Sequence, residues 1–264
     1  MPKQVPLYDA LAADYDRLVN WEGRLAHELP FFEHLFKERG VERVLDSACG
    51  TGHHAIALAQ QGFQVVGTDL SAVMVERARQ NAAAAGVAIA FHTAGLGALG
   101  THTCRASCQL ARGSNSTQSL PKEADPAEPG TLGEPFDAVL CLGNSLPHLL
   151  TSQAITEALA DFAAVLNPGG LLVVQNRNFD LVWAGQERFM PPQVHRDGDQ
   201  EWLFLRFYDF HEATIRFNMI RLHRRGQEWE QDVESTELRP IFRDEFALSL
   251  AAAGFDRVLF YGSY

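Results

Sequence analysis

A glycine-rich turn at the end of a short apolar run constrains the fold of this chain more than any other feature. Residues 44–52 read Val-Leu-Asp-Ser-Ala-Cys-Gly-Thr-Gly, residues 53–61 have the pattern of a short helix, and residues 63–69 form a second apolar run that ends in Asp69. In open α/β sheets, ligands bind beyond the carboxyl ends of the strands. The stretch therefore predicts a strand–turn–helix–strand unit with a ligand site at its mouth, where Asp46 and Asp69 each end a strand.

Strand and helix patterns alternate along most of the chain. Apolar runs predict strands over residues 43–46, 64–68, 87–92, 136–142, 171–175 and 255–261. Helical periodicity occupies most of the intervals, and strands separated by helices are typical of a parallel sheet. We therefore predict an α/β fold, a Rossmann-like, doubly wound, mostly parallel sheet, over residues 41–264. Residues 1–40 are rich in helix signals and are expected to form a helical lid.

From residue 200 to residue 238 the hydrophobic period changes to two. Trp202, Phe204, Arg206 and Tyr208 alternate with apolar residues in the first of three such runs. This period predicts an antiparallel ribbon appended to the parallel sheet on its substrate side. We expect the aromatic residues of the ribbon to pack in a core, and a substrate-contacting role is the alternative.

Residues 97–134 interrupt the alternation. They are rich in Gly, Ser, Thr and Pro, and we expect a disordered surface insertion, because long structureless connections are uncommon inside a compact domain. His102, Cys104 and Cys108 lie within it at a spacing that invites a zinc interpretation. Three ligands without a second Cys/His pair nearby are weak support for zinc, so we expect no metal site.

The formal net charge of −11, from 33 acidic and 22 basic residues, narrows the class of partner. Such a charge repels phosphate backbones and anionic lipid, so we expect a small-molecule substrate and neither nucleic acid nor a membrane. The first residues lack the apolar core of a signal peptide, and no apolar run approaches ~18 residues. We therefore expect a cytoplasmic protein, and a homo-oligomer is left open.

The glycine turn by itself is compatible with two kinds of cofactor. Residues 50–55 fit the G-x-G-x-x-G/A pattern of dinucleotide sites, with Asp69 placed to bind a ribose. A pyrophosphate cradle, however, offers backbone N–H groups and avoids carboxylates. Asp46 stands just before the turn, where an acid suits a cationic amine and sulfonium better than a pyrophosphate. The alternative is that Asp46 only caps the turn through backbone N–H groups.

Residues 44–52 and 67–74 (Gly-Thr-Asp-Leu-Ser-x-x-Met) resemble the first and second motifs of class I S-adenosylmethionine-dependent methyltransferases. Residues 136–148, which end in Gly-Asn-Ser-x-x-His, and residues 177–180, Arg-Asn-Phe-Asp, are similar to those of glycine and sarcosine N-methyltransferases. The resemblance covers about residues 1–96 and 134–264. It implies the class I fold, S-adenosylmethionine as cofactor and an amino-acid amine as methyl acceptor.

The resemblance also implies roles for single residues. Arg24 would meet the methionine carboxylate of the cofactor, and Asp69 would hold its ribose. Asn144 and Arg177 would bind the substrate, with Arg177 clamping an amino-acid carboxylate. The cofactor-binding positions that it implies are Tyr15, Arg24, Asp46, Ala48, Gly50, Gly52, Asp69, Leu70, Met74, Leu142, Ser145 and His148.

The sequence departs from the family pattern at two places. Gly95 stands where related chains place an Asp or Asn for the adenine amine, so we expect adenine recognition to depend on backbone groups. Related chains also continue past a sixth strand into a seventh, and we expect the seventh strand to be missing here. The expected consequence is an exposed sheet edge.

We assign no certain catalytic acid or base. Methyl transfer from a sulfonium depends mainly on positioning, and a neutral amine needs no dedicated base. Asn144 and His148 are the candidates, and the alternative for His148 is that it only packs against or hydrogen-bonds the cofactor. Arg177 has an alternative too, a structural salt bridge with Asp180 or Glu187.

The favoured function is S-adenosylmethionine-dependent methyl transfer to the amine of glycine, sarcosine or a related amino acid. Methyl transfer to oxygen or carbon of another small acid is one alternative. A degenerate protein that binds S-adenosylmethionine without turnover is another, and a dehydrogenase is the third.

Overall fold

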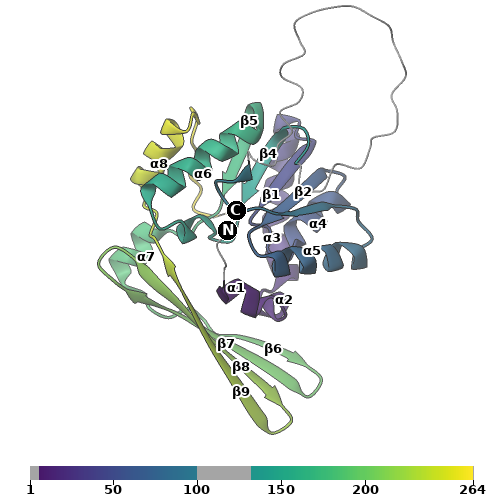
Figure 1. The fold of residues 1–264 in the computed structure, drawn as a ribbon, viewed down its shortest axis with the longest axis vertical. Helices are drawn as coiled ribbons and strands as arrows, with labels where there is room; N and C mark the ends of the chain where they lie inside the picture. The colour runs from purple at the N-terminus through teal and green to yellow at the C-terminus, as the bar shows by residue number, and fades with distance from the viewer. Residues whose placement is uncertain (1–5, 100–131, 264) are drawn as a thin grey trace, which may run out of the picture.

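The computed structural model describes residues 6–99 and 132–263, which form two separate sheets joined by helices (Figure 1). The larger sheet is parallel, with strand order β3-β2-β1-β4-β5. Its strands are β1 (Arg43–Ser47), β2 (Gln64–Asp69), β3 (Ala90–Thr93), β4 (Phe136–Cys141) and β5 (Leu166–Val174). The strand order reverses between β1 and β4, which is where ligands bind in such sheets. The predicted Rossmann-like fold is confirmed.

Helices cover both faces of the parallel sheet (Figure 1). On one face lie α3 (Trp21–Arg39), α4 (His53–Gln60) and α5 (Ala72–Ala84), and on the other α6 (Ser152–Val165) and α8 (Arg243–Ala252). Successive side chains of β1 point to opposite faces, so Val44 packs beneath α3 and α4 while Leu45 packs with α6. Because both faces are covered, β1 and β4 consist almost entirely of buried residues.

The smaller sheet is antiparallel and extends away from the parallel one (Figure 1). It comprises β6 (Gln193–Asp197), β7 (Gln200–Phe210), β8 (Ile215–Arg225) and β9 (Glu228–Leu238), in that order. The predicted antiparallel ribbon over residues 200–238 is confirmed, but it is a sheet of its own with an additional strand, β6. The buried face of β7 carries Trp202, Phe204 and Tyr208, as the period of two requires.

The N-terminal helices α1 (Pro6–Leu11) and α2 (Tyr15–Leu18) lie between the two sheets (Figure 1). Leu11 and Leu18 are buried against Trp202, Phe204 and Met219 of the antiparallel sheet. This apolar contact fixes the antiparallel sheet relative to the N-terminal segment, and it places α1 and α2 over the mouth of the parallel sheet.

Residues 255–261 do not form the strand that their apolar pattern predicts. Among the described residues the parallel sheet has five strands, and the segment after α8 is irregular. An extended segment becomes a strand only where a neighbour accepts its backbone hydrogen bonds. Here the segment is held by side chains instead: the Tyr261 ring packs 5.1 Å from that of Phe31, and Arg243 lies over Phe260.

The ends of the predicted insertion belong to the core. Leu99 and Leu132 are 0% and 1% exposed, and both pack with α6 and β4. The backbone N–H of Leu99 donates to Asp161 in α6 at 2.6 Å. The expectation of disorder therefore fails for the described ends of this stretch. His102, Cys104 and Cys108 lie outside the described residues.

Other boundaries shift by small amounts. The strand expected over residues 87–92 is β3, which begins only at Ala90, and the helix α6 is capped by Thr151, whose side chain accepts from the Ala154 N–H.

Cys49 and Cys141 are buried free thiols. Among the described residues no helix is long and apolar enough to cross a bilayer.

Candidate functional site

The glycine turn after β1 is built from backbone conformations that favour glycine. Gly50 and Gly52 have φ angles of +56° and +81°, and Ala48 adopts φ +58° despite its side chain. The carboxylate of Asp69 fixes the turn, because its Oδ2 accepts from the Gly50 N–H at 2.8 Å and its Oδ1 from the Ser71 N–H at 2.9 Å. Asp69, at the end of β2, thus fixes the glycine turn that follows β1, at the switch point of the sheet.

Space for a ligand remains above this turn. A Cβ added at Gly50 would meet only the ring of Tyr15, at 3.7 Å. At Gly52, in contrast, a Cβ would lie 2.9 Å from Ala78 and 3.1 Å from Phe91. Gly50 therefore faces an open side of the turn beneath α2, whereas Gly52 permits close packing of α4 and α5 against the sheet.

Asp46 is buried with part of its hydrogen-bonding capacity unused. It is 2% exposed, and its Oδ2 has no hydrogen-bond partner among the described residues. Burial raises the pKa of this carboxyl to about 6, while the nearby His54 and a backbone bond from Ala55 oppose the shift. The bond from Ala55 agrees with a capping role. The free Oδ2 is costly when buried, and it fits a site that receives a donor from a bound ligand.

A buried polar network positions Arg24 next to Asp46. Glu28 accepts from His54 Nε2 at 2.6 Å and, through its other oxygen, from Arg24 Nε and Gln175 Nε2, both at 3.0 Å. Gln175 in turn accepts from Arg24 Nη2 at 2.9 Å. Although burial opposes it, the bond from His54 and the charge of Arg24 lower the pKa of Glu28. Arg24 is thus charge-compensated and held in one orientation.

A cavity of about 330 Å³ lies where the carboxyl ends of β4 and β5, the N-terminal helices and the antiparallel sheet meet. It brings together five of the residues that the sequence singled out, which are Tyr15, Arg24, Asn144, His148 and Arg177. The remaining candidates do not line it: Asp46, Ala48, Gly50, Gly52, Asp69, Leu70, Met74, Leu142 and Ser145. The candidate residues therefore divide into a turn region and an adjoining cavity.

His148 ends the short 3₁₀ helix η3 (Leu146–His148) that follows β4, and it pairs with the N-terminal segment. Its Nε2 lies 2.9 Å from the phenol oxygen of Tyr8 in α1. Burial lowers the pKa of His148 to about 4, and burial raises that of Tyr8. Both side chains are therefore neutral near pH 7, and the pair closes one wall of the cavity.

Asn144 and Arg177 are joined across the sheet ends. Asn144 has φ +68°, and its Oδ1 accepts from the backbone N–H of Arg177 at 3.0 Å. The Arg177 guanidinium donates to a weak acceptor, Sδ of Met190 at 3.3 Å, and lies 6.0 Å from the ring centroid of Tyr208. Among the described residues it has no carboxylate partner, and Asp180 instead accepts from the Arg243 N–H.

The expected adenine side of the site is apolar and tight. A Cβ at Gly95 would approach Leu70 Cδ1 to 3.1 Å, so Leu70 fills the space that a polar side chain would need. Met74 is 1% exposed. Near the expected methionine end, the Leu142 carbonyl accepts from Ser145 Oγ at 2.8 Å.

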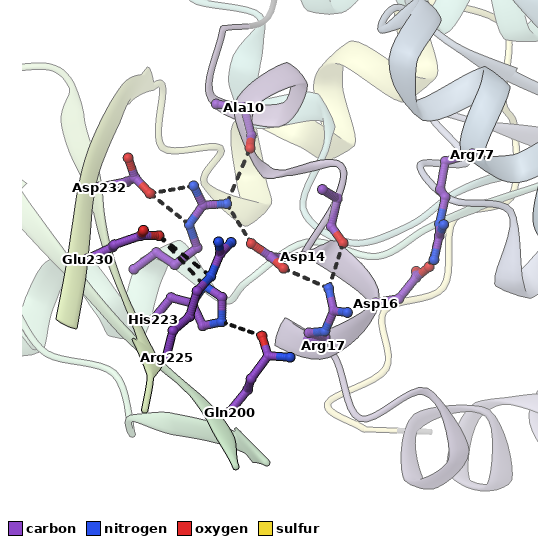
Figure 2. Close-up of polar contacts among 12 residues, drawn as sticks. Ala10, Asp14, Asp16, Arg17, Arg77, Gln200, His223, Arg225, Glu230 and Asp232 are labelled. Carbon is purple, nitrogen blue, oxygen red and sulfur yellow. Dashed lines mark hydrogen bonds and ion pairs between the residues drawn. The ribbon is translucent and has the colours of Figure 1, made fainter. Parts of the chain in front are cut away.

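Two aspartates of the N-terminal segment bind opposite parts of the molecule (Figure 2). Asp16 accepts from Thr51 Oγ1 at 2.6 Å in the glycine turn, and from Arg77 Nε at 3.2 Å in α5. Asp14 accepts from Arg221 Nη1 of β8 at 2.7 Å. Figure 2 shows Asp14 directed toward the antiparallel sheet and Asp16 toward Arg77. The N-terminal segment thus bridges the glycine turn and the antiparallel sheet.

Several contributors to the site escaped sequence reasoning, among them Asp16, Gln175 and Arg206. The partners of Asp16 and Gln175 are distant in sequence, and no local pattern marks them. Arg206 lines the cavity from β7, between Phe204 and Tyr208 on the buried face. A charged residue at an apolar position of a period-two strand is the signal that could have found it.

Comparison with known proteins gives consistent matches. A family model described as "Methyltransferase domain" matches residues 15–259. The glycine/sarcosine N-methyltransferase of Parasynechococcus marenigrum (strain WH8102) is 36% identical over 65% of this chain, and that of Aphanothece halophytica is 29% identical over 95%. The alignments span 50% of the first relative's length and 80% of the second's.

Solved structures share the fold. CalS10, a SAM-bound amino pentose methyltransferase from Micromonospora echinaspora, aligns with a TM-score of 0.65 at 22% identity, over 96% of this chain and 89% of its own. The sugar N-methyltransferase KedS8 from Streptoalloteichus sp. aligns with the same TM-score at 20% identity, over 96% and 85%. At these identities the likeness concerns the fold alone.

Proposed function

Since this chain belongs to the methyltransferase-domain family, we propose that it transfers a methyl group from S-adenosylmethionine to the amine of glycine, sarcosine or a related amino acid. The names of the two bacterial relatives support this acceptor. The structural observation that carries the proposal is the cavity beside the glycine turn, where the Arg177 guanidinium has no carboxylate partner among the described residues.

The turn region fits the cofactor. Asp46 offers a buried oxygen that lacks a partner, which suits a cationic donor group, and Gly50 leaves room above the turn. Asp69, fixed by two backbone N–H groups, is placed to accept from ribose hydroxyls. Arg24 is oriented toward the cavity by Glu28 and Gln175, as binding of the methionine carboxylate requires. Gly95 leaves adenine to backbone groups and to Leu70.

When bound, S-adenosylmethionine supplies an activated methyl group, whose C–S bond breaks as a C–N bond to the neutral amine forms and the amine proton is released. The protein's own part is to hold the acceptor. Arg177 binds the acceptor carboxylate through its planar fork. Asn176 also lines the cavity, and its buried Oδ1 has no hydrogen-bond partner among the described residues, so it can accept from the amine N–H.

Among the described residues that line the cavity, His148 is the imidazole that could accept the amine proton. His148 is neutral at physiological pH, because burial holds its pKa near 4, and such a weak base takes a proton only transiently. The bond between Tyr8 and His148 keeps α1 closed over the cavity and limits the entry of water. Orientation of the acceptor in a dry cavity can contribute roughly 7–11 kcal/mol to lowering the barrier.

The test is a transfer screen with methyl-labelled S-adenosylmethionine over glycine, sarcosine, dimethylglycine and small carboxylic acids without an amine. Labelled N-methyl product from the amines supports the proposal. Product from the acids alone would assign an O- or C-methyltransferase. Binding of S-adenosylhomocysteine without any methylated product would indicate a binding protein without turnover. Binding of NADH with no affinity for S-adenosylhomocysteine would indicate a dehydrogenase. The cytoplasmic location and the oligomeric state stay predictions.

A further inference from the structure

The cavity is unusually basic for so acidic a chain. Its lining includes Arg24, Arg177 and Arg206, and among the described residues it includes no Asp or Glu, although the net charge of the protein is −11. Arg24 is compensated by Glu28 directly beneath it. Among the described residues, neither Arg177 nor Arg206 forms an ion pair with a carboxylate.

Arg206 is held at the cavity from the buried face of β7. Phe204 and Tyr208, its neighbours on that face, are 0% and 2% exposed, and the Arg206 carbonyl accepts from the Met190 N–H at 3.0 Å. Its Nε is buried and has no hydrogen-bond partner among the described residues. Burial lowers the pKa of the Arg206 guanidinium, and the nearby positive charge of Arg177 lowers it further. The two guanidinium groups therefore repel each other.

Two neighbouring guanidinium groups repel each other and gain by sharing anionic ligands. One carboxylate, as in glycine or sarcosine, would compensate one of them and leave the other without a counter-ion in a partly buried site, which is unfavourable. A second anionic group on the same molecule would remove this cost. It would also satisfy the buried Nε of Arg206, and charge-assisted bonds of this kind are about twice as strong as neutral ones.

We propose that Arg177 and Arg206 form a double anion site and that the preferred methyl acceptor is an amine carrying two anionic groups, such as an amino dicarboxylate. The inference rests on the proposed N-methyl transfer and specifies its acceptor. The lining is otherwise suited to a short polar molecule: Asn144 and Asn176 offer amides, while Leu238, Phe217 and Met219 form the apolar wall. The second anion is a carboxylate or a phosphonate-like group, which share this chemistry.

The test compares acceptors that differ by one anionic group. Sarcosine and iminodiacetate are both secondary amines. Sarcosine has one carboxymethyl arm, and iminodiacetate carries a second carboxylate in place of one hydrogen of the N-methyl group. N-(phosphonomethyl)glycine carries a phosphonate at that position, so it distinguishes the two kinds of second anion. The wild-type protein should show a kcat/KM for one of the dianionic amines at least tenfold above that for sarcosine.

The substitution Arg206→Gln should lower the ratio of kcat/KM for the dianionic amine to kcat/KM for sarcosine at least tenfold, mainly through the KM of the dianionic amine. Arg196→Gln on β6 is the control, since Arg196 is exposed and pairs with Glu201 away from the cavity. A preference for sarcosine in the wild type, or an unchanged preference in Arg206→Gln, would overturn the double anion site while leaving N-methyl transfer in place. Absence of methylation of every amine would overturn the proposed function itself. Calorimetric binding of iminodiacetate in the presence of S-adenosylhomocysteine, weakened by Arg206→Gln, would then still support the anion site.

Discussion

The phenol oxygen of Tyr8 lies 2.9 Å from Nε2 of His148, and this contact joins the first described helix to the loop after β4. The two residues are far apart in sequence, and both side chains are half-buried. The pair therefore acts as a clasp between the N-terminal segment and the wall of the cavity.

Replacing Tyr8 by Phe removes the hydrogen bond and leaves a buried His148 nitrogen without its partner. We expect the free energy of unfolding at pH 7 to fall by about 1–2 kcal/mol, and methyl transfer to slow, because the segment closes less tightly. Urea denaturation and initial rates measure both effects. Tyr261→Phe is the matched control, since Tyr261 is 59% exposed. Equal free energies of unfolding for the two variants would show that the hydrogen bond between Tyr8 and His148 does not contribute to stability.

The substitution Asp46→Asn should have opposite effects on the stability of the ligand-free protein and on its affinity for the cofactor. The pKa of Asp46 is raised to about 6 in the folded chain, above its unfolded value near ~3.9. The folded state therefore binds the proton more tightly than the unfolded state, and stability falls as pH rises from about 4 to 6. Removing the charge should stabilise the ligand-free protein at pH 8 by roughly 1–3 kcal/mol and change little at pH 4, where the carboxyl of the folded protein is already neutral.

Chemical denaturation of the wild type and of Asp46→Asn at pH 4 and pH 8 measures this difference. The same variant should bind S-adenosylmethionine more weakly at pH 8, because the charge that faces the cationic end is lost. Equal destabilisation at both pH values would mean that Asp46 acts as a structural cap and that its charge has no cost in the fold.

Asp69→Ala should weaken binding of S-adenosylhomocysteine more than tenfold, which corresponds to about 1.4 kcal/mol. Two losses combine: the acceptor for the ribose hydroxyls, and the bonds that fix the Gly50 and Ser71 N–H groups. Isothermal titration calorimetry measures the affinity. Asp256→Ala, at an exposed position after α8, is the control. An affinity equal to that of the control would exclude the ribose assignment.

Asp16→Asn tests the attachment of the N-terminal segment. Hydrogen bonds from His53 and Thr51 outweigh the effect of burial and hold the pKa of Asp16 well below its usual range, so the carboxylate stays charged. Without that charge, amide hydrogens of residues 6–18 should exchange at least tenfold faster, while those of β1 and β4 remain protected. Glu22→Gln, in the exposed first turn of α3, is the control. Unchanged protection of residues 6–18 would show that other contacts hold the segment.

The parts of the fold that follow from local sequence could be predicted. The turn at Gly50 and Gly52, the short helix that follows it and the period of two around Phe204 all depend on neighbours along the chain, and the structure confirms them. The strand predicted over residues 255–261 is wrong, because strand formation depends on a hydrogen-bonding neighbour that an apolar pattern cannot reveal.

The same distinction applies to the candidate site. Motif residues such as Asp46 and Asp69 could be located at strand ends from their spacing. The contact of Asp16 with Thr51, the bond from Arg24 to Gln175, and the convergence of Arg177 and Arg206 on one cavity depend on the relative placement of segments that are far apart in sequence. No single stretch of sequence encodes that placement.

The most direct test of the account is the kinetics of methyl transfer to sarcosine by the wild type and by Arg177→Lys, with product and S-adenosylhomocysteine quantified by mass spectrometry. We predict equal amounts of N-methyl product and S-adenosylhomocysteine from the wild type. For Arg177→Lys we predict a raised KM, because Lys lacks the bidentate fork, and an unchanged affinity for S-adenosylhomocysteine. Binding of S-adenosylmethionine with no N-methyl product, or an unchanged KM in Arg177→Lys, would contradict the account.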